Sequence, residues 1–289
     1  MQKKDEGYPL RQSPLFRLRT KRKLAKLLNL TLPQLASFKR ADALYKESDI
    51  PKKNGGSRRI ENPRRDLKIT QARLARFLSR IAPPEYLFCP VKGRSYVSNA
   101  GRHIGHRVVR TLDVRKYFPS TTRERVYRFF RDTMECSPDV AALIADIGTY
   151  KGHLPTGSPL SPILAFYAHH ELWEKVHDIV RSAGGTDSLY IDDLTISGDK
   201  VPTRIMWEVR KHIHRAGLRY HKEKTFVDRP AEITGVIVSG DRLLAPNRQR
   251  LKKHRAEIAL SKATGDLEIA TLKQQIRGLV GQLKQIASG

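Results

Sequence analysis

Two adjacent aspartates, Asp192 and Asp193, are the residues of this sequence best suited to carry chemistry. They lie in the segment 190–193, Tyr-Ile-Asp-Asp, between two runs rich in apolar and β-branched residues. Aspartate is disfavoured inside a strand, and neighbouring carboxylates repel each other. A hairpin turn resolves the backbone conflict because aspartate tolerates turn geometry. Divalent cations between the carboxylates would resolve the charge conflict, although a solvated turn would also explain the pair taken alone.

A third aspartate, Asp113, ends the predicted strand 108–113, which contains Val108, Val109 and Leu112, and two aromatic residues follow at 117 and 118. By itself it could be the N-cap of a helix. Together with the Asp192–Asp193 pair, it completes a set of carboxylates able to hold two metal ions. Mg²⁺, for which Mn²⁺ can substitute, is a hard ion that binds one or two carboxylates together with substrate phosphates. Two such ions can activate an attacking hydroxyl and stabilise a leaving group.

The elements that must position these carboxylates are strands and long helices without regular β-α-β spacing. The predicted helices cover 21–38 (with a second helix opening at 31–33), 67–81, 123–134, 164–180, 203–216 and two basic segments after 247. The predicted strands cover two hairpins, 44–64 and 187–197, and two single runs, 108–113 and 233–238. This order predicts an α+β fold, with an antiparallel sheet backed by helices.

The charge of the chain indicates a polyanionic partner. Among 289 residues, 55 Lys and Arg stand against 29 Asp and Glu, a formal net charge of +26. Such an excess favours nucleic acid as the partner. A membrane is the rival, but the sequence has no run of 18 apolar residues and no apolar stretch typical of a secretory signal at its start. The isolated Cys89 and Cys136 fit a reducing cytoplasm and exclude a disulfide scaffold or a zinc site.

Four segments resemble, in order and spacing, the sequence motifs of reverse transcriptases. Segment 190–193 resembles their Tyr-x-Asp-Asp box, and 112–120 (Leu-Asp-Val-Arg-Lys-Tyr-Phe-Pro-Ser) resembles the first catalytic box. Segment 154–162 resembles the box that shapes the nucleotide and template pocket, and 217–225 the next box, whose lysine acts near pyrophosphate. The resemblance runs from about residue 14 to the last helices.

Two further segments resemble the retron reverse transcriptases of bacteria. Segment 99–103, Asn-Ala-Gly-Arg-His, fits the retron Asn-Ala-x-x-His signature, and 233–235, Ile-Thr-Gly, stands where retron enzymes usually have Val-Thr-Gly. Another bacterial defence-associated or group II intron-like (maturase-like) reverse transcriptase stays open as an alternative, and so does a catalytically silent RNA-binding relative.

The resemblance implies a right-hand polymerase fold: N-terminal helices and fingers at 1–107, a palm at 108–240 and a short helical thumb at 241–289. It implies an RNA-directed DNA polymerase in the cytoplasm that adds dNTPs to a primer end, using two Mg²⁺ ions. The template would be a cognate structured noncoding RNA and the product an RNA-linked DNA (msDNA). An accessory effector protein and a role in defence against phage would follow.

The resemblance also assigns roles to single residues. Asp113 and Asp192 would bridge both metals beside Val114, Asp193 would support the site, and Lys224 would be the pyrophosphate-side lysine. The residues expected around the incoming dNTP are Lys53, Arg58, Tyr117, Phe118 and Gly157. Phe118 would be the steric gate against ribonucleotides, unless it is a plain core residue. At Thr156, many reverse transcriptases have Gln, so no nucleotide contact is carried over to this side chain.

The expected contacts to RNA and to the template-primer duplex come from two regions. Asn99 and His103 belong to the retron signature, but a capped helix with a core-facing histidine would explain them equally well. The basic helix after 247 would lay cations along the nucleic-acid backbone unless it is only a solvated face. Its expected contact residues are Arg248, Lys252, Lys253 and Arg255.

Overall fold

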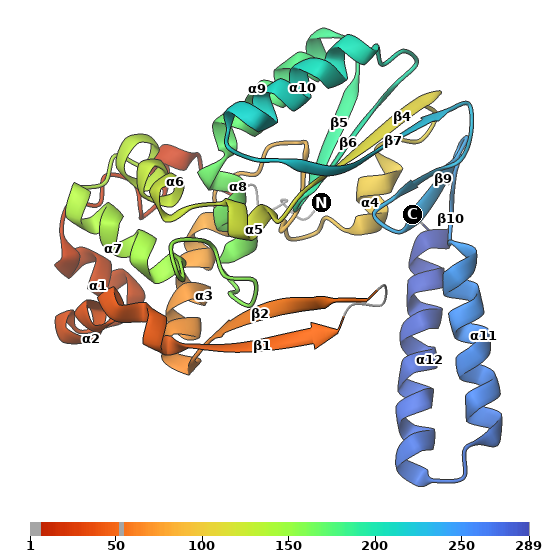
Figure 1. Cartoon of the computed structure of the whole chain (residues 1–289), viewed down its shortest axis with the longest axis horizontal. Coiled ribbons are helices and arrows are strands. Elements are labelled where there is room, and N and C mark those ends of the chain that lie inside the picture. Colours follow the sequence, from red (N-terminus) through yellow and green to blue (C-terminus); the bar gives the residue numbers. More distant parts are fainter. Residues whose placement is uncertain (1–6, 52–54, 289) are drawn as a thin grey trace, which may run out of the picture. The chain divides into compact units, whose positions relative to one another are not determined.

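The structure, a computed structural model, describes residues 7–51 and 55–288 (Figure 1). Its internal contacts divide the chain into two compact units, and each unit is built from three separate stretches. Unit 1 contains Met1–Glu85, Val114–His177 and Glu208–His221, and unit 2 contains Tyr86–Asp113, Asp178–Trp207 and Lys222–Gly289. The chain therefore passes repeatedly between the units, whereas the sequence predicted three consecutive domains; that functional division stays a prediction.

Unit 1 is mainly helical and carries one β-hairpin. Strands β1 (Tyr45–Pro51) and β2 (Ser57–Pro63) pair antiparallel from Tyr45↔Pro63 to Pro51↔Ser57, which confirms the predicted hairpin. The helices include α1 (Lys21–Leu28), α2 (Leu32–Ser37), α3 (Arg65–Ser79), α5 (Tyr117–Ser120), α6 (Arg123–Arg128), α7 (Pro138–Gly148) and α8 (Ser161–Ala168). Fully buried leucines of α1 and α3, such as Leu24 and Leu74, give this unit its own core.

Unit 2 is organised around a five-stranded sheet in the order β3-β5-β6-β4-β7. Its central strands β5 (Thr186–Tyr190), β6 (Asp193–Gly198) and β4 (Val108–Val114) pair antiparallel, and β3 (Leu87–Cys89) joins β5 in parallel. Strand β7 (Tyr220–Val227) closes the other edge. Helices α9 (His170–Ser182) and α10 (Thr203–Arg215) connect these strands, so the fold class is α+β as predicted.

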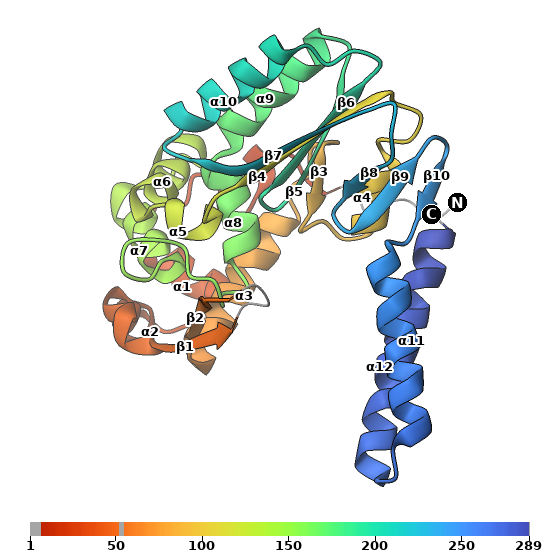
Figure 2. The same cartoon turned by 45° about the vertical axis from the view of Figure 1, so that its right-hand side comes forward.

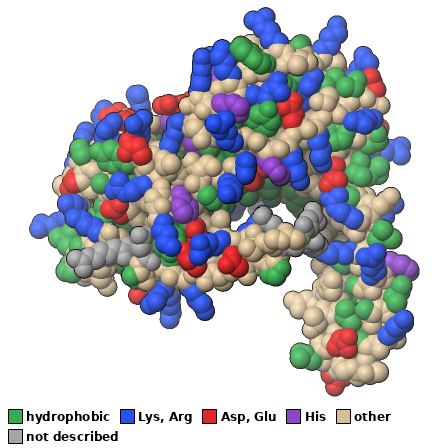
Figure 3. All heavy atoms as spheres, in the orientation of Figure 1, with side chains coloured by type: hydrophobic (Ala, Val, Ile, Leu, Met, Phe, Trp, Pro, Cys, Tyr) green, Lys and Arg blue, Asp and Glu red, His purple; other side chains and the backbone are tan. Residues whose placement is uncertain are grey.

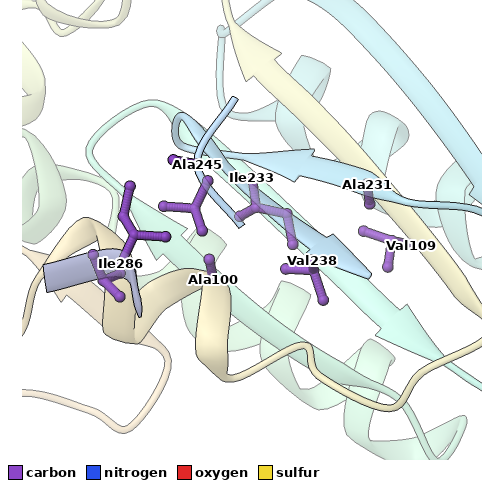
Figure 4. Close-up of a cluster of buried hydrophobic side chains, with 9 residues drawn as sticks. Ala100, Val109, Ala231, Ile233, Val238, Ala245 and Ile286 are labelled. Atoms are coloured by element: carbon purple, nitrogen blue, oxygen red, sulfur yellow. The ribbon is translucent and has the colours of Figure 1, made fainter. Parts of the chain in front are cut away.

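A second, smaller core lies in unit 2 between helix α4 (Tyr96–Gly101) and a three-stranded sheet. That sheet has the order β10 (Arg242–Leu244), β9 (Val236–Ser239), β8 (Ala231–Ile233). Ala100 of α4, Val109 of β4 and Ile286 of the last helix are buried in the same apolar cluster (Figure 4). The cluster thus ties the five-stranded sheet, α4 and the C-terminal helix together.

Two long helices close the chain. Helices α11 (Asn247–Lys262) and α12 (Asp266–Ala287) run side by side and contact each other along their length (Figure 2). They confirm the two helices predicted after residue 247. Among the described helices, none combines the length and the apolar character needed to cross a membrane.

The sequence was wrong about the continuity of two elements. The helix predicted at 164–180 is two helices, α8 and α9, because the backbone of His169 leaves helical geometry at ψ 19°. The strand predicted at 233–238 is a hairpin of β8 and β9, because Thr234 and Gly235 both have positive φ (46° and 85°). Two consecutive residues with positive φ form the turn that reverses a chain between antiparallel strands.

Candidate active site

The paired aspartates lie at the tip of the β5–β6 hairpin, as the sequence predicted. Tyr190 pairs with Asp193, which leaves Ile191 and Asp192 as the two-residue loop. Ile191 has φ +60°, a left-handed conformation that costs a β-branched residue about 1–3 kcal/mol. Positive φ at the first loop residue alone is the pattern of a type II′ hairpin turn, in which this position is normally glycine. Strand pairing on both sides must therefore hold the turn in place, with Asp192 at its outer end.

Asp113 of β4 is the direct cross-strand partner of Asp193 of the neighbouring strand β6. The register of β4 and β6 pairs Asp113 with Asp193 and Leu112 with Leu194. Because side chains alternate along a strand, the two carboxylates share one face, and the two leucines share the other. Directly opposed residues in an antiparallel pair have Cβ atoms about 4.5–5.5 Å apart. The structure thus brings Asp113 and the Asp192–Asp193 turn together, although they are far apart in the sequence.

Asp193 is buried beside two other carboxylates, and both circumstances disfavour its ionisation. The pKa of Asp193 is raised to about 7, first by burial and then by the charges of Asp192 and Asp113. Lys224 of β7 is the cation that opposes this rise. Near neutral pH the site without a cation therefore holds a carboxyl group that is only partly ionised. A bound divalent cation would oppose this shift, because its charge favours the ionised carboxylate.

The donor set fits a hard divalent cation that brings most of its own ligands. In the described part of the chain, no three His, Cys, Asp or Glu side chains are already arranged to hold an ion. Mg²⁺ needs only one or two carboxylates when waters and phosphate oxygens complete its shell. Asp113, Asp192 and Asp193 are the carboxylates that the strand pairing gathers here, and the assignment of Asp113 and Asp192 as the metal ligands stays a prediction. The neighbouring Val114 is fully buried on β4 and could contribute only its backbone carbonyl.

Segment 154–162 is docked along β2 in unit 1. The Thr156 hydroxyl accepts a hydrogen bond from the Glu61 backbone N–H (3.2 Å) and donates one to the Arg59 carbonyl (3.0 Å). Gly157 approaches β2 so closely that a Cβ atom there would lie 2.7 Å from the Glu61 carbonyl oxygen. Thr156 is therefore used to hold the β1–β2 hairpin. This role gives a physical reason for a residue shorter than Gln, and the sequence did not reveal it.

Of the two aromatic residues that follow Asp113, Tyr117 is buried in the core and Phe118 is partly exposed. The Tyr117 hydroxyl donates to the Ala165 carbonyl and accepts from Trp173 Nε1, both at 2.9 Å, and the side chain is 3% exposed. Phe118 is half-buried, with its ring centroid 6.1 Å from that of Tyr117. Tyr117 thus supports the position of Phe118 from the interior, and its hydroxyl is occupied.

Comparison with known proteins agrees with this geometry. Residues 50–238 match the family model described as reverse transcriptase (RNA-dependent DNA polymerase). The chain belongs to the reverse transcriptase family. The match covers the end of β1, all of β2, all three aspartates and the segment docked along β2, so the predicted family resemblance is confirmed.

Curated relatives of this reverse transcriptase include retron enzymes. The chain is 30% identical to the retron Se72 reverse transcriptase of Salmonella heidelberg, over 61% of this chain and 48% of that protein. It is also 30% identical to the retron Mx65 reverse transcriptase of Myxococcus xanthus, over 82% of this chain and 60% of that protein. The chain thus spans about half to three fifths of their length. A foamy viral protease-reverse transcriptase in complex with RNA/DNA hybrid matches at a TM-score of 0.45, with 16% identity, over 81% of this chain and 27% of that one.

The two residues of the retron signature lie in the interior of this reverse transcriptase. Asn99 and His103 are both 0% exposed. Asn99 Nδ2 donates to the Thr234 hydroxyl (3.3 Å), and the His103 ring lies between two serine hydroxyls. The N-terminus of α4 is capped by Ser95, whose hydroxyl accepts from the Ser98 N–H. These contacts are those of a capped helix with a core-facing histidine; a role in RNA binding stays a prediction.

The basic residues predicted to contact nucleic acid or dNTP differ in whether an acidic side chain already pairs with them. Arg248 makes a two-pronged ion pair with Glu232, and Lys253 Nζ lies 2.8 Å from Glu257. Lys252 and Arg255 are exposed and make no ion pair within the described residues. Lys and Arg side chains recur across the face drawn in Figure 3. Arg58 is exposed on β2, and Lys53 lies outside the described residues.

Replacing Asp193 by Asn should stabilise the metal-free protein above neutral pH. The folded-state pKa of Asp193, about 7, is above its ordinary value of 3.8, so the ionised carboxylate opposes folding as pH rises from 4 to 7. Denaturant unfolding at pH 8 in EDTA should show a gain of about 1–4 kcal/mol, which vanishes below about pH 4. Asp241→Asn, at a highly exposed carboxylate, is the control and should change little. An Asp193→Asn protein that is less stable than wild type at pH 8 would contradict the crowding of these carboxylates.

Gly157→Ala should destabilise the protein because the added methyl group meets the β2 backbone. We expect a loss of about 1–3 kcal/mol in the free energy of unfolding. Gly278→Ala is the matched control, since a Cβ atom there meets nothing within 4 Å in the middle of α12. That substitution should stabilise by up to about 1 kcal/mol through helix propensity. Equal effects of the two substitutions on thermal unfolding would refute the close approach at Gly157.

Proposed function

We propose that this protein is a retron-type RNA-directed DNA polymerase, which extends a primer end with dNTPs on a structured noncoding RNA. One observation carries the proposal: Asp113 lies across the sheet from Asp193, beside the turn that presents Asp192, within a chain of the reverse transcriptase family. The names of the curated relatives support the retron subtype.

The catalytic carboxylates prepare a site for cations and for phosphate. Two Mg²⁺ ions held by Asp113 and Asp192, with the Val114 carbonyl beside them, would supply the positive charge that the attacking 3′-oxygen and the leaving pyrophosphate require. Asp193 adds negative charge that strengthens cation binding. Lys224 Nζ, a cation facing this cluster, is the group we assign to the pyrophosphate side, where it would donate a proton to the leaving oxygen.

The nucleotide would be held by residues of the β1–β2 hairpin and of the segments next to it. Arg58 and Lys53 would contact the triphosphate, where a guanidinium can bind two phosphate oxygens at once. Gly157 would let the backbone approach the nucleotide. Phe118 would exclude a 2′-hydroxyl, and Tyr117, whose hydroxyl is occupied, would act by holding the Phe118 ring.

The duplex of template and primer would lie against the cations of α11. Lys252 and Arg255 are the free charges we assign to phosphate, whereas Arg248 and Lys253 would first have to exchange Glu232 and Glu257 for phosphate. Each neutralised phosphate releases counterions, so the affinity should fall steeply with salt. Asn99 and His103, being buried, would affect RNA binding through the position of α4.

In its finer form, the proposal makes the template a cognate RNA of the cytoplasm and the product msDNA, the RNA-linked DNA of retrons. An accessory effector protein and a role in defence against phage belong to the same proposal. A group II intron-like enzyme or another defence-associated polymerase is the main alternative. A catalytically silent RNA-binding relative is disfavoured, because such a protein has no need to hold Asp193 buried beside two other carboxylates that oppose its ionisation.

Asp192→Asn should abolish Mg²⁺-dependent incorporation of dNTPs on a primed RNA template. We expect kcat to fall by about 10³-fold or more, because a ligand shared by the cations is lost. Binding of the template should stay within about twofold, because phosphate contacts are untouched. Asp241→Asn again serves as the control with full activity. Incorporation by the Asp192→Asn protein at the wild-type rate would overturn the proposed site.

Phe118→Ala should relax the discrimination against ribonucleotides. Removing the ring opens space for a 2′-hydroxyl, and an apolar pocket can distinguish such a group by about 10- to 100-fold. The ratio of kcat/KM for dGTP to that for GTP should fall by this amount. Phe16→Ala, at a half-buried phenylalanine elsewhere in unit 1, should leave the ratio unchanged. An unchanged ratio in the Phe118→Ala enzyme would show that Phe118 is a plain core residue.

A further inference from the structure

His103 joins the two strands of the catalytic hairpin from the interior of unit 2. Its Nδ1 lies 2.7 Å from the Ser197 hydroxyl, and its Nε2 lies 2.7 Å from the Ser188 hydroxyl. Ser188 belongs to β5, which leads into the turn, and Ser197 belongs to β6, which leads out of it. A single imidazole ring therefore spans both strands that carry Asp192 and Asp193.

The ring lies on the same face of the sheet as the carboxylates. Ser197 is four residues after Asp193 on β6, and Ser188 is the direct partner of Thr195 between them. Because every second side chain points to the same face, Asp193, Thr195 and Ser197 line one face together with Ser188. The distance from Ser197 to Asp193 along the strand is about 13 Å. The other partner, Ser188, is opposite Thr195, about 7 Å along the strand from Asp193, so the ring bonds the strands that carry the carboxylates, and its two nitrogens are bonded to the serines rather than to the carboxylates.

The hydrogen bonds of this ring have a fixed polarity. Burial, and then the charges of Arg102 and His106, lowers the pKa of His103 to about 3, so the ring is neutral. A neutral imidazole has one N–H donor and one acceptor nitrogen. One serine hydroxyl therefore accepts from the ring and the other donates to it, and a purely apolar side chain can replace neither bond.

The segment that carries His103 is bonded on two sides. Arg102 Nε donates to the Asp187 carbonyl of β5 (2.8 Å), which adds a second link to the hairpin. On the other side, Asn99 Nδ2 donates to the Thr234 hydroxyl, which donates to the Tyr96 carbonyl (3.1 Å). Thr234 lies in the β8–β9 turn, and those strands pack in the cluster that includes α4 and α12 (Figure 4). The hairpin is therefore linked through this segment to the apolar cluster of unit 2.

We propose that His103 is a positioning residue for polymerisation: by bridging Ser188 and Ser197, it holds β5 and β6 so that the Asp192–Asp193 turn meets Asp113. This inference rests on the proposed polymerase function and deepens it. It assigns His103 an action on catalysis and cation binding without contact to nucleic acid. Residues that orient groups binding a metal typically change affinity or activity by about 10- to 100-fold when they are replaced.

The test compares variants that remove the bridge in different ways. His103→Leu keeps much of the volume but none of the hydrogen bonds, His103→Gln keeps one donor and one acceptor, and Ser188→Ala with Ser197→Ala removes both partners. Three quantities are measured on protein shown by circular dichroism to be folded at the assay temperature. They are kcat for dNTP incorporation, the affinity for Mn²⁺ by electron paramagnetic resonance, and the affinity for the RNA template.

We expect the His103→Leu variant and the double serine-to-alanine variant to lose about tenfold or more in kcat and in Mn²⁺ affinity. The His103→Gln variant should recover part of both, and the RNA affinity of all variants should stay within about twofold of wild type. If His103→Leu does not fold, the single Ser197→Ala variant, which leaves the ring in place, should show the same effects in smaller size.

Two results would overturn the positioning role. Folded variants with wild-type kcat and wild-type Mn²⁺ affinity would show that His103 only fills space. A loss of RNA affinity with unchanged kcat on saturating template would show that it serves RNA binding. Failure of the wild-type protein to incorporate any dNTP would instead refute the proposed function. In that case the Mn²⁺ measurement still decides whether His103 positions the carboxylates.

Discussion

The site depends on mutual repulsion among carboxylates that the sheet forces together. Asp113 and Asp193 are direct cross-strand partners, and Asp192 adjoins them in the turn. Like charges placed directly opposite each other destabilise an antiparallel pair. The same strands compensate on the opposite face, where Leu112 and Leu194 are each 1% exposed. Apolar burial on one face thus maintains an unfavourable electrostatic arrangement on the other, and a cation is the group that relieves it.

Backbone geometry shows the same constraint. A β-branched residue at φ +60° in the Ile191 position persists only where the surrounding structure determines the conformation. The determining contacts are the β5–β6 pairing, the pairing of β4 with β6, and the His103 bridge between Ser188 and Ser197. Strain in the turn and repulsion between the carboxylates are therefore sustained by the same set of strands.

Local features of this site could be predicted from the sequence, and features that depend on tertiary contact could not. The β5–β6 hairpin was predictable because alternating strands flank a turn-tolerant Asp pair. The break at His169 was not, since the apolar residues before it and Leu172 and Trp173 after it continue a helical pattern. The use of Thr156 to bind the β2 backbone was also invisible, because its partners are main-chain groups distant in the sequence. The two interpretations of the Asn99 and His103 signature likewise became distinguishable only when their burial was known.

The protein as a whole is strongly positive, whereas the local charge at the β5–β6 turn is negative. The net charge of +26 produces a long-range attraction for polyphosphates, which raises the rate of encounter and is screened by salt. At the β5–β6 turn, the local field is negative enough to raise the pKa of the Asp193 carboxyl group, together with its burial, to about 7. A nucleic acid drawn by the first field would meet, at the turn, a cluster that repels phosphate unless cations intervene. Under the proposed function, the aspartates would make productive approach of a triphosphate conditional on the metal, and this would couple cation binding to nucleotide binding.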